Sequence, residues 1–176
     1  QAAPSGAEVL AAAAEGLAQP TKLDQLSIRT ENGSEPVDGS RLVGIIAEAC
    51  SGVEHVDPQR VIDETASTLY DGMPMAELTL APVLAARTLV EQHPDYSFVA
   101  ARLLLDGLRA EALSLLTDEP TTASAAEMGQ IYPQYLAEYI EFGIRVGRLD
   151  PRLGTFDLER MGAAIQPERD LDFTYL

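Results

Sequence analysis

The sequence has very little positive charge. It contains 12 lysine and arginine residues against 28 aspartates and glutamates, which gives a formal net charge of -16, and its only lysine is Lys22. The arginines are scattered singly instead of forming a basic patch. Nucleic acids and anionic membrane surfaces attract clustered positive charge. We therefore expect neither a nucleic-acid partner nor a membrane partner.

Cysteine and long apolar runs are also scarce. Cys50 is the only cysteine, so no internal disulfide can form, and its helical apolar neighbourhood predicts a buried structural thiol in a reducing, cytoplasmic compartment. No apolar run approaches the ~20 residues of a membrane span. The alanines at 11–14 have no basic segment before them, which argues against a signal peptide. Because the chain starts at Gln1 and stops in an apolar-aromatic run, we expect a piece of a longer protein.

Catalytic and metal-binding patterns are hard to find. The two histidines, His55 and His93, fall in predicted loops without the i, i+4 partner of a helical metal pair, which indicates surface loop histidines. Acidic pairs such as Asp63 with Glu64 lie on polar helix faces, where carboxylates are normally just solvated. The turn at 31–34 is too short and too poor in glycine for a phosphate-binding P-loop. We predict no catalytic residue, no metal ligand and no intrinsic cofactor.

Hydrophobic periodicity predicts a mostly helical α+β fold. After a linker with one helix at 7–18, polar and apolar residues alternate from Gln25 to Thr30, Asn32-Gly33 suits a tight turn, and 34–37 suits a return strand. Asp38 or Ser40 can cap the helix that follows, and the pair Asp57-Pro58 is typical of a helix start. The predicted helices span about 40–52, 58–71, 76–92, 94–116, a tyrosine-rich stretch at 132–144, and 157–164.

These elements divide the chain into three predicted parts. Residues 1–21 form a linker or arriving helix, residues 22–117 form one compact unit of four helices and a hairpin, and residues 118–176 form a helical appendage. The solvated run from Asp118 to Thr122 marks the second boundary. Pro82 falls inside the third helix of the compact unit, where an interior proline costs ~3 kcal/mol unless packing offsets it.

Several segments carry a family resemblance. The segment 29–32 is followed by Pro36-Val37-Asp38 and then by Arg41, and further along the chain come the turn 69–73 and the helix start 95–103. This order of segments resembles the ATP-cone, a small regulatory domain. The resemblance implies a four-helix bundle capped by a small β-hairpin or three-stranded sheet. The segment 169–175 is similar to the run that leads into the catalytic barrel of class I ribonucleotide reductase large subunits. The resemblance thus implies a ribonucleoside-diphosphate reductase as the parent enzyme, whose chemistry lies beyond Leu176.

The resemblance also implies where an ATP or dATP effector, with Mg²⁺, would bind. The family's strand and early-helix basic residues are retained as Arg29 and Arg41, whereas the second basic position is Thr30, and Val37 lies between them. The family's threonine, histidine and late-helix lysine are replaced by Met75, Thr79 and Ala110. We therefore expect weak or lost nucleotide binding. From the pattern alone, Arg29 and Arg41 have the plainer interpretation of two surface arginines.

The sequence leaves three functions open. The region is either a decayed cone that serves as a structural relay or oligomer interface, a working ATP/dATP activity switch, or an unrelated helical interaction module. The family implies as partners the rest of the large subunit, other large subunits and the small radical-generating subunit. The exposed stripe Tyr132, Tyr135 and Tyr139 is a candidate contact surface, and its plainer interpretation is packing against the barrel.

Overall fold

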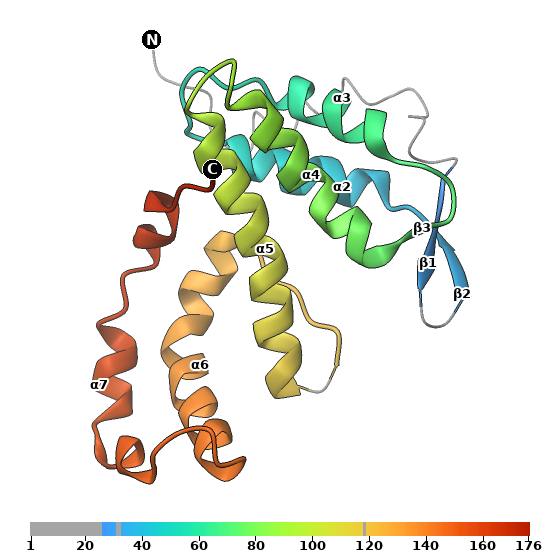
Figure 1. Ribbon diagram of the computed structural model, residues 1–176. Coiled ribbons are helices and arrows are strands. Elements are labelled where there is room, and N and C mark those ends of the chain that lie inside the picture. Colours follow the sequence, from blue (N-terminus) through green and yellow to red (C-terminus); the bar gives the residue numbers. More distant parts are fainter. Residues whose placement is uncertain (1–25, 31–32, 118) are drawn as a thin grey trace. The chain divides into compact units, whose positions relative to one another are not determined.

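The computed structural model describes residues 26–30, 33–117 and 119–176. Its helices and strands form two compact units (Figure 1). The first contains the described residues up to Leu104 together with Phe173–Leu176, and the second is Leu105–Asp172. This division falls inside a helix, whereas the boundary predicted from sequence follows residue 117, so the predicted domain limits stay a prediction. The predicted helix at 7–18 lies outside the described residues.

The first unit contains a small three-stranded sheet. Strands β1 (Ser27–Thr30) and β2 (Gly33–Pro36) pair antiparallel, so the predicted hairpin is confirmed. The third strand, β3 (Met73–Pro74), pairs parallel to β1, which gives the order β2-β1-β3. Sequence patterning did not single out β3, because two residues are too few to show alternation.

The turn before β3 is fastened to β1. The Asp71 carboxylate accepts hydrogen bonds from the backbone N–H of Ser27 at 2.9 Å and from its hydroxyl at 2.6 Å, and the Gly72 N–H donates to the Ser27 carbonyl at 2.8 Å. Gly72 has φ +77°, a conformation that a side chain disfavours. The Tyr-Asp-Gly turn is therefore the link that brings a distant segment into the sheet.

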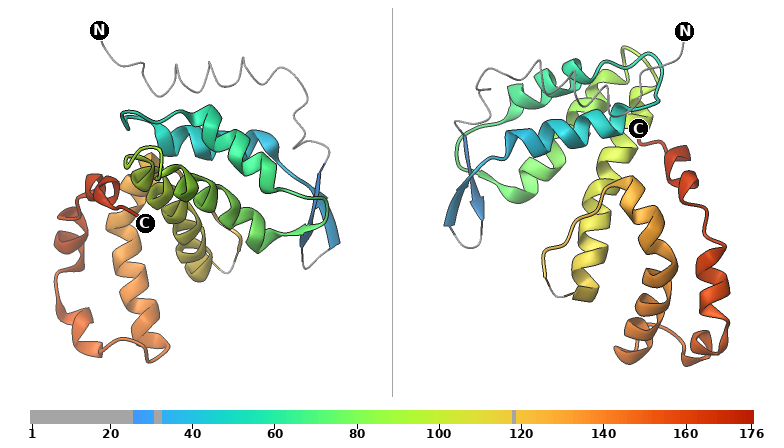
Figure 2. Two further views of the ribbon diagram at one scale, coloured as in Figure 1. Left: turned by 45° about the horizontal axis from the view of Figure 1, so that its top comes forward. Right: turned by 180° about the vertical axis from the view of Figure 1, so that it is seen from behind.

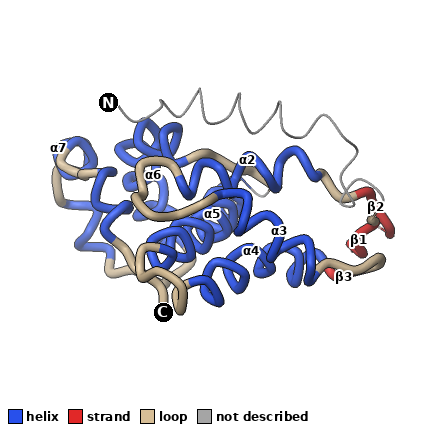
Figure 3. The backbone as a smooth tube through the Cα atoms, turned by 90° about the horizontal axis from the view of Figure 1, so that it is seen from above, coloured by secondary structure: helices blue, strands red, loops and turns tan. Residues whose placement is uncertain are grey.

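Four helices follow the predicted order. Asp38 caps the first by accepting from the Arg41 N–H at 2.9 Å, and Asp57 caps the second by accepting from the Gln59 N–H at 2.9 Å, with Pro58 in the first helical position. The bounds are α2 Gly39–Cys50, α3 Pro58–Thr68, α4 Met75–Leu89 and α5 Tyr96–Thr117. The sheet lies at one end of α2, α3 and α4 (Figure 3).

One hydrophobic core holds these helices together. Its largest fully buried apolar side chains are Ile46 of α2, Val61 of α3 and Val99 of α5. Pro82 lies inside α4 and is itself buried, so the packing of its ring contributes to offsetting the lost helical hydrogen bond. The last residues of the chain join this unit: the Tyr175 N–H donates to the Ser97 carbonyl at 3.0 Å, and the guanidinium of Arg87 lies 4.9 Å from the centre of the Tyr175 ring.

The second unit contains the end of α5 and the remaining helices. Helix α6 (Ala125–Arg145) begins with a capping box, in which the Ser124 hydroxyl accepts from the Glu127 N–H and the Glu127 carboxylate accepts from the Ser124 N–H. It packs against α7 (Leu158–Ala163), as the two views of Figure 2 show. The remaining elements are the 3₁₀ helices η2 (Pro151–Thr155) and η3 (Pro167–Asp172). A small core of Leu113, Ala123 and Met128 joins α5 to α6.

In the part of the chain that the structure describes, no helix combines the length and the apolarity needed to cross a membrane.

Candidate functional site

Most of the predicted nucleotide-binding residues lie around the sheet of the first unit. In the β1–β3 pairing Arg29 lies opposite Pro74, so Met75, the first residue of α4, follows directly. The Val37 N–H donates to the Leu26 carbonyl at 3.0 Å, which places it between β2 and α2. The predicted residues and their places are Arg29 and Thr30 on β1, Val37 before α2, Arg41 in the first turn of α2, and Met75 and Thr79 at the start of α4.

Arg29 is exposed beside the Tyr-Asp-Gly turn. The Tyr70 hydroxyl donates to the Glu77 carboxylate at 2.8 Å, and this hydrogen bond raises the pKa of Tyr70, while the positive charge of Arg29 acts in the opposite direction. Arg29 is therefore near enough to Tyr70 to influence its ionisation. A guanidinium in this place can meet an anion that approaches the edge of the sheet.

The predicted residues other than the two arginines offer few hydrogen-bond donors to a phosphate. The Thr30 hydroxyl lies 3.2 Å from both the Gly33 carbonyl and a Glu35 carboxylate oxygen, and the Thr79 hydroxyl donates to the Met75 carbonyl at 3.1 Å. Each hydroxyl has a single hydrogen to donate, and it is already used. Val37 is 6% exposed, and the Met75 side chain is exposed but can only accept weakly through its sulfur. Ala110 lies on α5 in the second unit.

The predicted structural thiol is confirmed. Cys50 is buried at the end of α2, and burial raises its pKa to about 12, while the charge of Arg102 acts against that rise. A thiol with so high a pKa is almost wholly protonated at neutral pH, so it is a poor nucleophile and a poor metal ligand.

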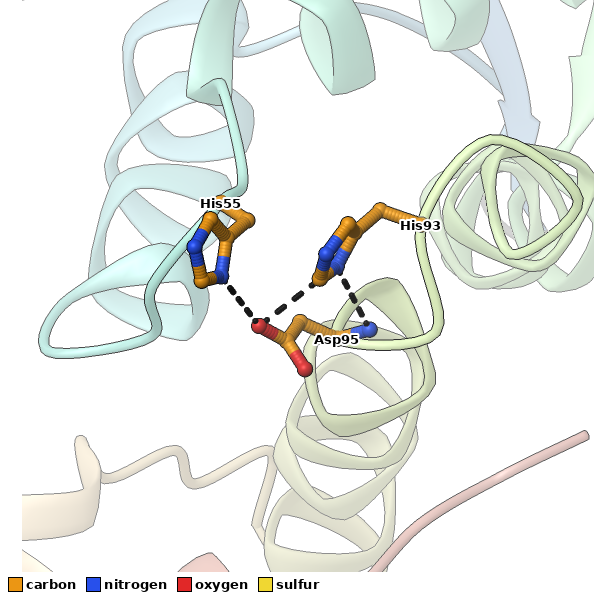
Figure 4. A group of neighbouring side chains, drawn as sticks. All are labelled: His55, His93 and Asp95. Atoms are coloured by element: carbon orange, nitrogen blue, oxygen red, sulfur yellow. Dashed lines mark hydrogen bonds and ion pairs between the residues drawn. The ribbon is translucent and has the colours of Figure 1, made fainter.

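The histidines form a cluster that the sequence did not reveal. As predicted, both lie in loops, His55 between α2 and α3 and His93 between α4 and α5. The structure stacks their rings at 4.6 Å between centroids and places both Nδ1 atoms near one Asp95 carboxylate oxygen, at 3.1 Å from His55 and 3.5 Å from His93 (Figure 4). Local spacing carries no signal for this arrangement, because the two loops are 38 residues apart in sequence and meet only through the fold.

The tyrosine stripe on α6 is largely used within the second unit. The Tyr132 hydroxyl donates to Asp170 at 2.5 Å, and burial together with this hydrogen bond raises the pKa of Tyr132 to about 12. The Tyr135 hydroxyl donates to the Ala112 carbonyl at 3.1 Å, beside a groove of about 500 Å³. Tyr139 stacks on Tyr135 at 5.9 Å and stays 40% exposed. Only Tyr139 thus keeps a large accessible area for another protein surface.

The chain has homologues among the large, or alpha, subunits of ribonucleotide reductase, whereas no protein-family model matches it. It is 37% identical over 139 residues to the ribonucleoside-diphosphate reductase subunit alpha of Chlamydia muridarum, which is 78% of this chain and 13% of that protein. It is 27% identical over 153 residues to the same subunit of Enterobacteria phage T4, covering 84% of this chain and 18% of the phage protein. A ribonucleoside-diphosphate reductase large subunit of Vaccinia virus is 32% identical over 94 residues. The chain spans less than a fifth of the length of these relatives.

Proposed function

We propose that this chain is an ATP-cone-like regulatory region of a ribonucleoside-diphosphate reductase large subunit, and that it works through its fold and its protein contacts more than through tight nucleotide binding. Two observations support the proposal. The homologues are large subunits, and a small sheet at the end of a helical bundle agrees with the architecture expected of an ATP-cone. The expectation of weak nucleotide binding rests on a single observation, which is that the Thr30 and Thr79 hydroxyls already donate hydrogen bonds within their own hairpin and helix.

The loss in nucleotide affinity can be bounded. A charge-assisted hydrogen bond to a phosphate contributes ~1.5–3 kcal/mol, so losing three of the four family donors that are replaced at Thr30, Met75, Thr79 and Ala110 removes ~4.5–9 kcal/mol. A micromolar dissociation constant corresponds to about 8 kcal/mol of binding free energy. Loss of three donors is therefore large enough to move ATP or dATP from micromolar to millimolar affinity or weaker.

The alternative is a working ATP/dATP activity switch. It rests on Arg29 and Arg41, which carry two cations to the same end of the first unit, on β1 and in the first turn of α2. Such a switch needs an effector that binds two assemblies of the enzyme with different affinity. Two guanidiniums alone would bind the triphosphate without selecting its base.

The proposed partners are the rest of the large subunit, other large subunits and the small radical-generating subunit, in the cytoplasm. Exposed apolar side chains that a protein partner would cover are Leu80 and Leu84 on α4, at 48% and 52% exposure, and Tyr139 on α6. The chain contributes contact surface in this proposal, and the reduction of ribonucleotides belongs to other regions of a large subunit.

Calorimetric titration of the folded chain with dATP and with ATP, each with Mg²⁺, tests the proposal. We expect no binding tighter than about 1 mM. A variant that combines Thr30→Lys, Met75→Thr and Thr79→His is expected to bind at least tenfold more tightly, and adding Arg29→Ala to it should remove the gain. Micromolar binding by the native chain, abolished by Arg29→Ala and Arg41→Ala, would instead establish the activity switch.

A further inference from the structure

We infer that His55, His93 and Asp95 form a binding site for one divalent transition-metal ion of the zinc type. The inference is independent of the nucleotide question, because the cluster lies on the loops that follow α2 and α4. Both helices start at the sheet, so these loops lie at their far ends. Among the described residues, these three form the group of histidine and carboxylate side chains that could share one metal ion. Their ligand atoms all lie within 4.8 Å of one another.

The distances suit a tetrahedral ion. Zinc binds imidazole nitrogen at ~2.0–2.1 Å and carboxylate oxygen at ~2.0–2.2 Å, so two ligand atoms of one tetrahedron are about 3.4 Å apart. The Asp95 Oδ2 atom lies 3.1 Å from His55 Nδ1 and 3.5 Å from His93 Nδ1, on either side of that value. The two rings need to approach each other by at most about 1.4 Å to complete the triangle, and the 61% exposed His55 side chain has room to turn.

His93 Nδ1 and the Asp95 carboxylate oxygen face each other as two acceptors. His93 Nδ1 lies 3.3 Å from the Asp95 N–H, from which it accepts, and therefore presents a lone pair. The same nitrogen faces the Asp95 carboxylate, which also presents lone pairs. One Nδ1 atom cannot both accept from the amide and donate to the carboxylate. A cation bound at His93 Nδ1 would use the same single lone pair, so it would replace the long hydrogen bond from the Asp95 N–H and place a positive charge between the nitrogen and the carboxylate.

The surrounding fold holds the two loops together before any ion binds. The Asp57 N–H donates to the hydroxyl of Tyr96 at 3.1 Å, and Tyr96 is 2% exposed, so the α2–α3 loop is fixed to the start of α5. Arg102 of α5 donates to the Ser51 carbonyl at 2.8 Å in the same loop. Metal sites with a prearranged second layer of contacts bind more tightly, because less order has to be created on binding.

Backbone geometry points the same way. Among the described residues, His55 is the non-glycine residue that has a positive φ, at +57°. Histidine, asparagine and aspartate reach this conformation more readily than other side chains, yet it remains uncommon. It turns the chain so that the imidazole faces the neighbouring loop (Figure 4).

The chemistry of the ligands selects the ion. Imidazole suits Zn²⁺, Ni²⁺, Co²⁺ and Cu²⁺, whereas Mg²⁺ and Ca²⁺ prefer oxygen ligands only. Two nitrogens and one oxygen leave the fourth tetrahedral position to water or to a group of another molecule. A net charge of -16 raises the local concentration of any divalent cation around the chain.

The test uses the full 176-residue chain, freed of metal with a chelator, and Zn²⁺ alone as the probe. Competition with a chromophoric chelator is expected to give one Zn²⁺ per chain with micromolar or tighter affinity. His55→Asn, His93→Gln and Asp95→Asn should each weaken binding at least about tenfold, since even a residue that only supports a ligand costs that much. Asparagine is chosen at position 55 because it tolerates positive φ.

The control variant is Asp63→Asn, an exposed carboxylate on α3 outside the cluster, which is expected to keep the native Zn²⁺ affinity. Circular dichroism melts without metal establish that each variant is folded, and Zn²⁺ should raise the melting temperature of the native chain and of Asp63→Asn only. Substitution by Co²⁺ adds a spectrum of tetrahedral type, and the ring NMR signals of the two histidines should shift together. Equal Zn²⁺ affinity in the native chain and the three cluster variants, or no binding at millimolar Zn²⁺ by the folded native chain, would overturn the inference.

Discussion

The guanidinium of Arg102 closes the end of α2 from a neighbouring helix. Its Nη1 donates to the Ala49 carbonyl at 3.1 Å and to the Ser51 carbonyl at 2.8 Å, two of the backbone acceptors that every helix leaves unpaired at its C-terminal end. Burial lowers the pKa of Arg102, and its Nε is buried without a hydrogen-bond partner among the described residues, so desolvation offsets part of the gain. We therefore predict that Arg102→Met lowers the free energy of unfolding by about 2–4 kcal/mol, from ~1.5–3 kcal/mol for each charge-assisted bond less that offset.

The measurement is urea denaturation followed by circular dichroism. Methionine keeps much of the aliphatic volume of the arginine stem, so the loss reports mainly on the two hydrogen bonds. Arg60→Met is the matched control: Arg60 is exposed in the same unit and donates to the Gln92 side chain, and its replacement should cost about 0.5 kcal/mol or less. A loss below about 1 kcal/mol for Arg102→Met, or one no larger than that of the control, would refute the reasoning.

Three further predictions concern ionisation and packing. The hydrogen bonds from Ser27 lower the pKa of Asp71. The Asp71 carboxylate therefore stabilises the fold above the ordinary aspartate pKa, near pH 4, and this contribution is lost as the pH falls below that value. Asp71→Asn should flatten the acid limb of a stability-against-pH curve, and an unchanged limb would contradict this. With its pKa raised to about 12, Cys50 should resist a thiol reagent at pH 8 in the native chain and react at once in denaturant; fast native labelling would disprove burial. A Cβ at Gly162 would lie 2.5 Å from a backbone carbonyl oxygen of α6, so Gly162→Ala should destabilise the chain by about 1–3 kcal/mol in a thermal melt, whereas Gly129→Ala, with contacts of 3.4 Å, should be neutral or stabilising.

Local sequence signals predicted much of the fold. The capping residues Asp38 and Asp57 mark helix starts through short-range hydrogen bonds, which a single chain segment displays by itself, whereas Asn32 of the predicted hairpin turn lies outside the described residues. Local patterning located neither strand β3, although the family resemblance implied a hairpin or a three-stranded sheet, nor the His55–His93 stack, for the opposite reason. Each is created by segments that are distant in sequence and meet only after the helices have packed.

The predicted nucleotide-binding residues show the same limit. Sequence placed Arg29 and Thr30 on a strand and Met75 and Thr79 near a helix start, and the structure agrees with those placements. The sequence could not predict which groups accept the hydrogen bonds of the two threonine hydroxyls, because the partners of Thr30 lie across the hairpin. The role of these residues toward a nucleotide stays a prediction that titration will decide.

The chain returns to the first unit at its C-terminus, where the Tyr175 N–H bonds to Ser97 and the ring lies by Arg87. In covalent terms residues 105–172 are thus an insertion with two attachments to one host. A protease that cuts once within that stretch would yield two bands on a denaturing gel, while the nicked protein could still elute as one species from a sizing column. Limited proteolysis of this region therefore has to be followed on a denaturing gel and on a sizing column, because the gel alone would show an assembly that is cut but still intact as two separate pieces.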